Sequence, residues 1–301
     1  GDNSGSAYFD VNQRRGIRWN TSKAFLKPAA RRPNLTIMTG CHVERLLLET
    51  TEAEPRCAGI VFTGGGTQWQ ATAKRETILT AGAIGSPQLL QLSGIGPAAL
   101  LRQHGIEPVR DAPGVGGNLQ DHLQLRMVFK VQGVKTLNVM ASNMFGKMQI
   151  GLQYALFQSG PMSMAPSQLG AFAKSDPQQA TPNLQYHVQP LSLDKFGEPL
   201  HAFPAFTASV CNLRPTSRGR VDIASADSYA APKIVPNYLS TDQDRKVAAD
   251  ALRLTRSIAA APALQKFAPE EYKPGIAFQS EEELAQAASQ IGTTIFHPVG
   301  T

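Results

Sequence analysis

The stretch Ala81–Gly96, AGAIGSPQLLQLSGIG, decides how the chain around it is interpreted. It follows the apolar-rich run Thr77–Thr80, which predicts a short buried strand. Small residues then remove side chains where the chain turns or meets another surface. Ser86 and Pro87 are typical of a helix start, the leucines supply a buried face, and Gly94 ends the helix. On pattern alone, a tightly packed turn without a ligand remains the simpler interpretation.

Strand-like runs surround this unit on both sides. Before it, the predicted strands are Leu35–Met38, Val43–Glu49, Cys57–Phe62, Thr67–Ala73 and Glu76–Thr80, with Gly64–Gly66 as a hairpin loop. A second helix is predicted at Pro97–His104, closed by Gly105. Later strands are predicted at Leu125–Gln132, Asn183–Gln189, Phe203–Cys211 and Gly219–Ala224, and helices at Ser142–Gln158, Thr241–Ala261 and from the capping box at Ser280–Glu283.

Composition is that of an ordinary globular protein. The 301 residues are 42% hydrophobic, enough for one large or two modest domains. The net charge of +6 comes from scattered basic pairs rather than a basic stripe with aromatics, so no nucleic-acid partner is predicted. Three dispersed cysteines favour a reducing compartment, and the interpretation is cytoplasmic, with peripheral membrane association and a homo-oligomer left open.

Metal and hydrolase chemistry are not predicted. His42, His104 and His201 stand apart from any cysteine or carboxylate at ligand spacing. No G-x-S-x-G nucleophile elbow occurs, and no apolar run approaches the roughly 20 residues that span a bilayer.

Three motifs in a fixed order resemble one family. Gly82–Gly96 is similar to the second signature of the glucose-methanol-choline (GMC) family of flavoprotein oxidoreductases. Pro113–His122, PGVGGNLQDH, follows at the family's usual interval, and Phe296–Thr301, FHPVGT, resembles the segment that carries the family's catalytic histidine. Similarity to choline dehydrogenases and related alcohol dehydrogenases runs from about Ile17 to the end.

The resemblance implies an α+β or α/β fold. A partial FAD-binding domain is expected over residues 1–122. A substrate domain with a mainly antiparallel sheet flanked by helices follows over 123–290, and 291–301 begin the return to the FAD-binding domain. The family's N-terminal G-x-G-x-x-G turn, which holds the FAD pyrophosphate, does not occur in this sequence. We therefore interpret the chain as the middle and late part of a longer enzyme, incomplete at both ends.

His297 is the first catalytic candidate. In the family, the histidine of this motif removes the hydroxyl proton, or stabilises the alkoxide, while a hydride leaves for flavin N5, and imidazole suits proton transfer near neutral pH. The family shares the task with a second His or Asn that this chain does not contain. His187 is the second candidate, because it shares one strand face with Gln185 and Gln189 and matches a substrate-contacting histidine of choline-oxidising relatives. A polar residue on a solvent-facing strand side is the alternative interpretation.

Cofactor contacts are carried over from the motifs. The backbone of Val43 would hold the FAD adenine. The other cofactor residues implied are Ala81 and Gly82 in the glycine-rich turn, Asn118 and His122 in the NLQDH group, and Pro298 beside His297. For Asn118 and His122, a purely structural role stays open.

The implied activity is FAD-dependent oxidation of a primary alcohol to an aldehyde, with a small-molecule alcohol as substrate and an unidentified electron acceptor. A non-redox hydroxynitrile lyase on the same scaffold, and a non-catalytic substrate-domain fragment, are the alternatives. Choline-binding relatives place a glutamate in the strand 125–132, whereas this chain has Lys130. A lysine there would repel a quaternary ammonium ion, so the sequence favours a neutral or anionic alcohol over choline.

Overall fold

The computed structural model describes residues 3–49, 55–165, 167–195 and 197–301. These divide into two compact units whose segments alternate along the chain. Unit 1 contains residues 1–35, 122–216 and 241–295, and unit 2 contains residues 36–121, 217–240 and 296–301. Assignment of functions to residues 1–122, 123–290 and 291–301 stays a prediction.

Unit 1 is built on an antiparallel sheet with the strand order β1-β10-β11-β12-β9-β15, and β16 also pairs with β9. The strands are β1 (Gly5–Tyr8), β9 (Leu123–Lys130), β10 (Leu169–Ala173), β11 (Leu184–Gln189), β12 (Ala205–Asn212), β15 (Glu270–Lys273) and β16 (Gly292–Thr294). A small hairpin, β2 (Gln13–Arg14) and β3 (Ile17–Arg18), precedes a π-helical turn at Ser22–Leu26 and α1 (Lys27–Ala29).

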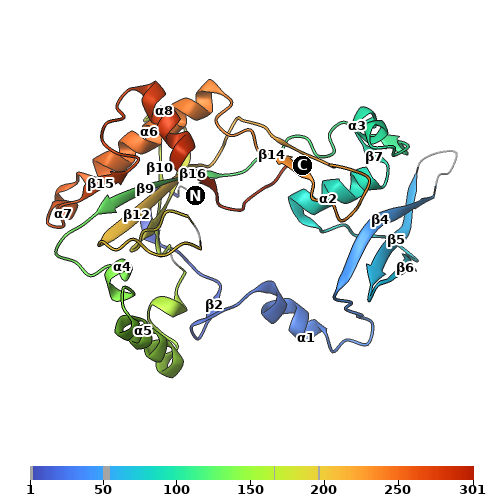
Figure 1. The fold of residues 1–301 in the computed structure, drawn as a ribbon, viewed down its shortest axis with the longest axis horizontal. Coiled ribbons are helices and arrows are strands. Elements are labelled where there is room, and N and C mark those ends of the chain that lie inside the picture. The colour runs from blue at the N-terminus through green and yellow to red at the C-terminus, as the bar shows by residue number, and fades with distance from the viewer. Residues whose placement is uncertain (1–2, 50–54, 166, 196) are drawn as a thin grey trace. The chain divides into compact units, whose positions relative to one another are not determined.

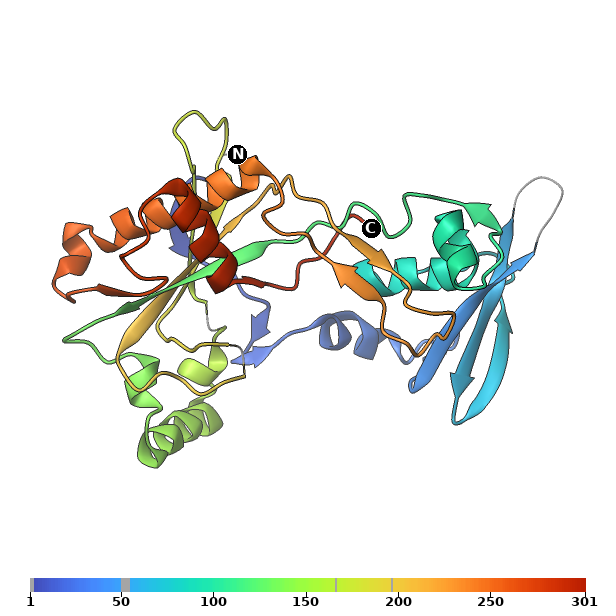
Figure 2. The same cartoon turned by 45° about the horizontal axis from the view of Figure 1, so that its top comes forward.

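Helices cover one face of this sheet (Figure 1). They are α6 (Asp242–Ala259), α7 (Pro262–Gln265) and α8 (Glu281–Ile291), and α6 packs on β12 and α8. Figure 2 shows α6 and α8 on the same side of the strands. The predicted capping box of α8 is confirmed, and the Thr241 side chain caps α6 by accepting from the Asp244 N–H. The other helices of the unit are α4 (Leu137–Met140), α5 (Met144–Phe157) and a 3-10 turn at Pro161–Ser163.

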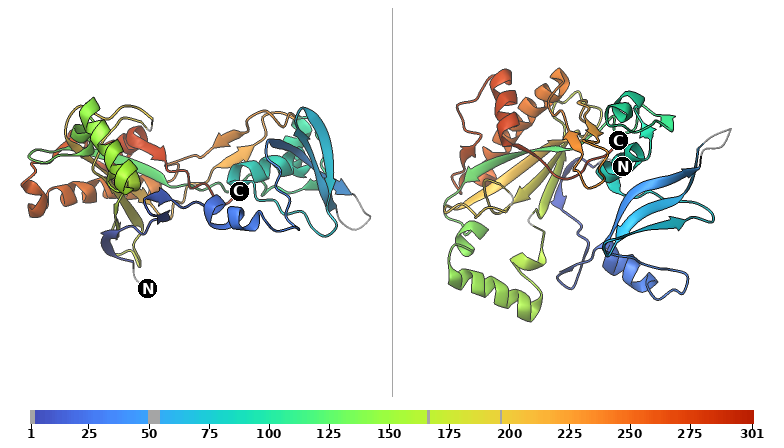
Figure 3. Two further views of the ribbon diagram at one scale, coloured as in Figure 1. Left: turned by 90° about the horizontal axis from the view of Figure 1, so that it is seen from below. Right: turned by 45° about the vertical axis from the view of Figure 1, so that its right-hand side comes forward.

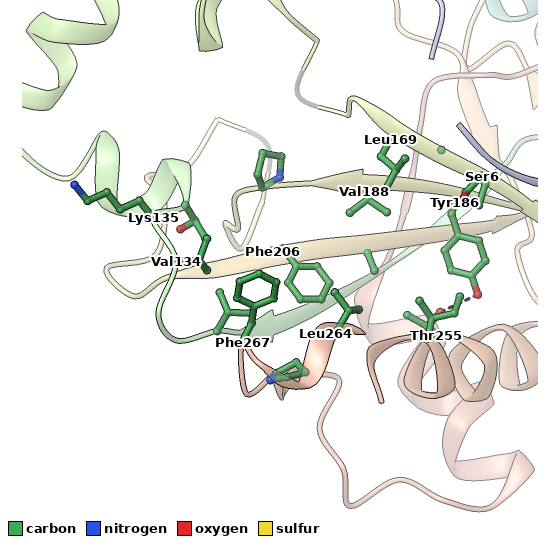
Figure 4. A pocket seen from close by; sticks show the side chains of 18 residues that line it. Ser6, Val134, Lys135, Leu169, Tyr186, Val188, Phe206, Thr255, Leu264 and Phe267 are labelled. Atoms are coloured by element: carbon green, nitrogen blue, oxygen red, sulfur yellow. Dashed lines mark hydrogen bonds between the residues drawn. The ribbon is translucent and has the colours of Figure 1, made fainter. Parts of the chain in front are cut away.

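An apolar pocket of about 540 Å³ lies on the helix side of the sheet (Figure 4). Phe206, Val188 and Leu264 line it, and its polar atoms include the Tyr186 hydroxyl, which hydrogen-bonds to Thr255 Oγ1 at 3.1 Å. Lys135 points away from it (Figure 4). Burial raises the pKa of Tyr186 to about 12.

This buried phenol predicts a loss of stability at high pH. Because the pKa in the folded state is raised above the ordinary 10.0, the contribution of Tyr186 is complete below pH 10 and is lost as pH rises toward 12. We expect this residue alone to lower the free energy of unfolding of unit 1 by about 2 kcal/mol across that range. Urea denaturation of wild type and Tyr186→Phe at pH 9 and about pH 11.5 measures it.

Tyr8→Phe is the matched control, because Tyr8 lies on β1 of the same sheet but is 80% exposed, so the substitution removes a phenol without removing a buried one and should leave the pH dependence unchanged. An equal loss of stability in wild type and Tyr186→Phe would show that the prediction is wrong.

Unit 2 combines a three-stranded antiparallel sheet with α2 (Figure 3). Its strands are β4 (Cys41–Glu49), β5 (Arg56–Gly64) and β6 (Thr67–Thr72), with the predicted glycine hairpin between β5 and β6. Helix α2 (Gly82–Leu92) is followed by β7 (Ile95–Gly96), α3 (Ala98–Gln103) and β8 (Arg110–Asp111), and β13 (Arg220–Asp222) pairs with β14 (Lys233–Val235).

Two predicted strands of this unit are wrong. Residues 35–38 and 76–80 are not strands, and Ile78 is 74% exposed. Both runs are apolar enough for a strand, but a strand also needs a neighbour for its backbone hydrogen bonds. Neither run has such a neighbour within the described ranges.

Candidate functional site

The glycine-rich stretch Ala81–Gly96 contains helix α2, which begins earlier than the sequence predicts. Helix α2 starts at Gly82, and Pro87 lies inside it instead of in its first turn. Proline has no N–H, so the Ala83 carbonyl lacks its helical donor. The hydroxyl of Thr301 donates to that carbonyl at 2.6 Å. The FHPVGT motif is thereby attached to the first turn of the glycine-rich motif, and the C-terminus lies beside α2 (Figure 3).

The NLQDH group holds the same C-terminal segment from its other side. Gln120 and Val299 exchange backbone hydrogen bonds of 2.8 and 2.9 Å as an isolated antiparallel bridge. The Asn118 side chain donates to the Gly300 carbonyl at 3.1 Å, and a Cβ on Gly300 (φ +94°) would lie 2.6 Å from the Asn118 carbonyl oxygen. Glycine is therefore required at position 300 for this close approach.

His297 lies near the start of the C-terminal segment, residues 296–301, that these contacts hold. Its backbone N–H donates to Asp121 Oδ1 at 3.0 Å, and the second carboxylate oxygen of Asp121 accepts from the Tyr238 hydroxyl. Asp121 is buried, with 8% exposure, whereas the His297 side chain is exposed and Pro298 is half-buried. The arrangement fixes the backbone of His297 and leaves its imidazole accessible.

The small residues at the start of α2 fit the wall of a flavin site. Gly82 has φ +76°, and no heavy atom lies within 4 Å of the place where its Cβ would be. Ala81 precedes the helix without a side-chain cap. Open space beside the backbone at the start of a helix allows a cofactor to approach the main chain closely.

Val43 belongs to the same unit but to another element. It lies on β4 opposite Phe62, next to a bulge between Val43 and Arg45. Strand β4 is attached to the end of α2 by a 2.8 Å hydrogen bond from the Leu46 N–H to Ser93 Oγ. The structure thus brings Ala81, Gly82, Asn118, His297 and Pro298 around α2 and places Val43 on the adjoining sheet.

His187 and His122 belong to unit 1. His187 lies on β11 between Gly170 and Ser209, on the sheet face opposite Tyr186 and the apolar pocket, with its ring 5.1 Å from that of Phe9. His122 is half-buried, with Nε2 3.3 Å from the Leu213 carbonyl oxygen.

The His187 face is polar, as the sequence predicts, and parts of it are buried, which the sequence does not indicate. Ser209 is fully buried, and its hydroxyl lacks a hydrogen-bond partner within the described part of the chain. It pairs across the sheet with Arg126, which is 6% exposed and whose pKa is lowered by burial. Polar side chains buried on one sheet face are typical of a binding surface rather than of a hydrophobic core.

Lys130 ends β9 beside an acidic residue. Its ammonium lies 3.7 Å from Glu270 and 5.0 Å from the ring centroid of Tyr272. Both charged side chains are partly exposed, so the pair reduces the positive field of Lys130 only modestly. The preference for a neutral or anionic alcohol over choline stays a prediction.

Asp121 and Tyr238 are the other residues that the sequence did not single out. Asp121 was visible in the NLQDH group, whereas nothing in the sequence around Tyr238 predicts its contact with that carboxylate. In the described ranges, no group of three or more His, Cys, Asp or Glu side chains could hold a metal ion, and no helix is long and apolar enough to cross a bilayer.

Comparisons with known proteins agree on one family. Residues 1–124 and 215–301 match the N-terminal and C-terminal models of GMC oxidoreductase. The chain is 36% identical over 300 residues to an alcohol dehydrogenase [acceptor] of Pseudomonas putida, covering 99% of this chain and 53% of that protein. It is 40% identical over 283 residues to an oxygen-dependent choline dehydrogenase of Vibrio vulnificus, covering 94% and 50%.

A solved structure also superimposes on this chain. Formate oxidase from Aspergillus oryzae, solved to study modification of its FAD, superimposes with a TM-score of 0.88 at 24% identity, over 98% of this chain and 55% of that one. The chain spans about half the length of the curated relatives it matches.

Proposed function

The chain belongs to the GMC oxidoreductase family, and we propose that its full-length protein oxidises a primary alcohol to an aldehyde with FAD. Bound FAD would accept the hydride. The small residues at the start of α2 and Asn118 would border it, the Val43 backbone would contact its adenine, and His122 and Pro298 would complete its surroundings.

His297 would remove the hydroxyl proton of the alcohol. Its side chain is exposed while its backbone is fixed by Asp121 and by the Gln120–Val299 bridge, as a base that must reach a substrate requires. His187 would contact the substrate from the polar sheet face of unit 1. The convergence of three sequence motifs on the His297 segment is the observation that carries this proposal.

Anaerobic titration of the full-length flavoprotein tests the activity. We expect the flavin absorption to bleach on addition of at least one alcohol from a panel of an aliphatic primary alcohol, a benzylic alcohol, a hydroxy acid and choline. Dithionite provides the fully reduced spectrum as a control. A spectrum that no alcohol changes, in a protein that dithionite bleaches, would contradict alcohol oxidation, and cleavage of a hydroxynitrile by the same preparation would favour a lyase.

A further inference from the structure

We propose that Asp121 is a positioning residue for His297, fixed in turn by Tyr238, an inference that rests on the proposed role of His297 as the base. The carboxylate connects two segments that are far apart in sequence. One oxygen accepts from the His297 N–H at 3.0 Å, and the other accepts from the Tyr238 hydroxyl. With 8% exposure, Asp121 makes these bonds where little water competes.

The backbone on both sides of this contact is strained. Among the described residues, seven other than glycine have positive φ, and four of them lie in the segments that meet here: Asn118 (+61°), Asn237 (+58°), Leu239 (+55°) and Phe296 (+63°). Asparagine adopts left-handed backbone readily, whereas for Leu239 and Phe296 it is unfavourable and persists only where the surroundings enforce it.

Three of these four residues flank a group that Asp121 joins. Phe296 turns the chain directly before the His297 N–H, and Asn237 and Leu239 stand on either side of Tyr238. Neighbouring hydrogen bonds hold the same loops, from Asn237 Nδ2 to the Arg218 carbonyl at 3.1 Å and from the Ser240 N–H to Ser217 Oγ at 3.0 Å. The carboxylate thus joins two preformed turns, and loss of it would free the His297 turn to relax.

A carboxylate suits this position because both partners are donors. One oxygen accepts from the His297 N–H and the other from the Tyr238 hydroxyl, and no other short side chain offers two equivalent acceptor atoms in this way. Asparagine can replace it in part, because its amide oxygen accepts from the N–H and its amide nitrogen can donate to a hydroxyl that has rotated. Asp121→Asn therefore keeps both contacts without the charge, and Asp121→Ala removes both. Tyr238→Phe removes only the hydrogen bond from the Tyr238 hydroxyl to the carboxylate.

The test uses the full-length flavoprotein and two independent measurements. Hydrogen exchange followed by mass spectrometry reports on the peptide spanning residues 296–301. Anaerobic stopped-flow reduction by an alcohol of the panel that bleaches the wild-type flavin reports on the chemical step. For Asp121→Ala we expect faster exchange in that peptide and a limiting reduction rate lowered by about 10- to 100-fold, with the half-saturating alcohol concentration changed by less than about threefold. Tyr238→Phe should show smaller changes of the same kind, and Asp121→Asn should stay close to wild type.

Asp111→Ala is the matched control. Asp111 Oδ1 also accepts from a backbone N–H in unit 2, that of Ala98 at 2.9 Å, but at the start of α3. We expect it to leave both measurements unchanged.

Wild-type exchange and reduction in Asp121→Ala would overturn the proposal. So would faster exchange throughout unit 2 with loss of flavin, which would make Asp121 a general structural residue. If His297→Ala slows reduction and Asp121→Ala does not, the positioning role of Asp121 is contradicted, and the proposed role of His297 as the base is not. If neither variant slows reduction, the proposed function of His297 fails, and the positioning role with it.

Discussion

Replacement of His297 by alanine is expected to lower the limiting rate of flavin reduction by alcohol by about 10²- to 10⁴-fold, the usual contribution of a positioned acid–base group. The His297 side chain is exposed, and the backbone N–H of His297 is bound by Asp121. Removing the imidazole should therefore leave residues 296–301 in place. Flavin content and the exchange of residues 296–301 should therefore stay close to wild type. Anaerobic stopped-flow spectrophotometry of the full-length protein measures the rate.

His104→Ala is the control for this experiment. His104 is the C-terminal cap residue of α3, in the same unit but outside the three motifs, and its replacement should change the rate by less than about twofold. A His297→Ala protein that binds FAD and is reduced at the wild-type rate would remove His297 from the chemistry. A rate restored by added imidazole would support its role as the base.

Local patterns predicted much of the fold. The capping box at Ser280, the glycine hairpin between β5 and β6 and the end of α2 at Gly94 each depend on residues that are close in sequence, and each is confirmed. The start of α2 was predicted at Ser86 and is wrong. Pro87 is tolerated inside the helix because Thr301, more than two hundred residues away, supplies the missing donor to Ala83. Such long-range compensation leaves no mark in the surrounding sequence.

The candidate site also combines features that are local in the sequence with contacts that only the fold creates. The motifs identified the segments that carry His297 and Asn118, because their spacing is a property of sequence. Which side chain would hold His297 depends on the path of the loop after β14, and only the structure brings Tyr238 to Asp121. The same holds for Lys130, because its neighbour Glu270 is 140 residues away in the sequence and only the pairing of β15 with β9 brings the two together.

Gln91→Ala is expected to destabilise unit 2 by about 3 to 5 kcal/mol, the largest effect on stability that we predict. Gln91 is completely buried on α2 and makes three hydrogen bonds to backbone groups. Its amide nitrogen donates to the carbonyls of Val115 and Val221 at 3.2 and 3.0 Å, and its amide oxygen accepts from the Ile223 N–H at 2.8 Å. Truncation leaves these groups without partners and opens a cavity between α2, the loop before the NLQDH group and β13. Native-state hydrogen exchange at the α2 amides measures the free energy of opening.

Gln88→Ala is the matched control, because it lies one turn earlier on α2 and makes one half-buried hydrogen bond, to the Ala230 carbonyl at 3.0 Å. It should cost only about 1 kcal/mol. Gln91→Glu sharpens the comparison, since it keeps the acceptor for Ile223 but can donate at most one hydrogen bond, and only when protonated. It should therefore also destabilise unit 2, because at least one of the two carbonyls is left facing an oxygen. Equal stability of Gln91→Ala and Gln88→Ala would mean that the carbonyls of Val115 and Val221 find other donors. In that case Gln91 would not be what holds α2 against the loop that carries Asn118 and Asp121.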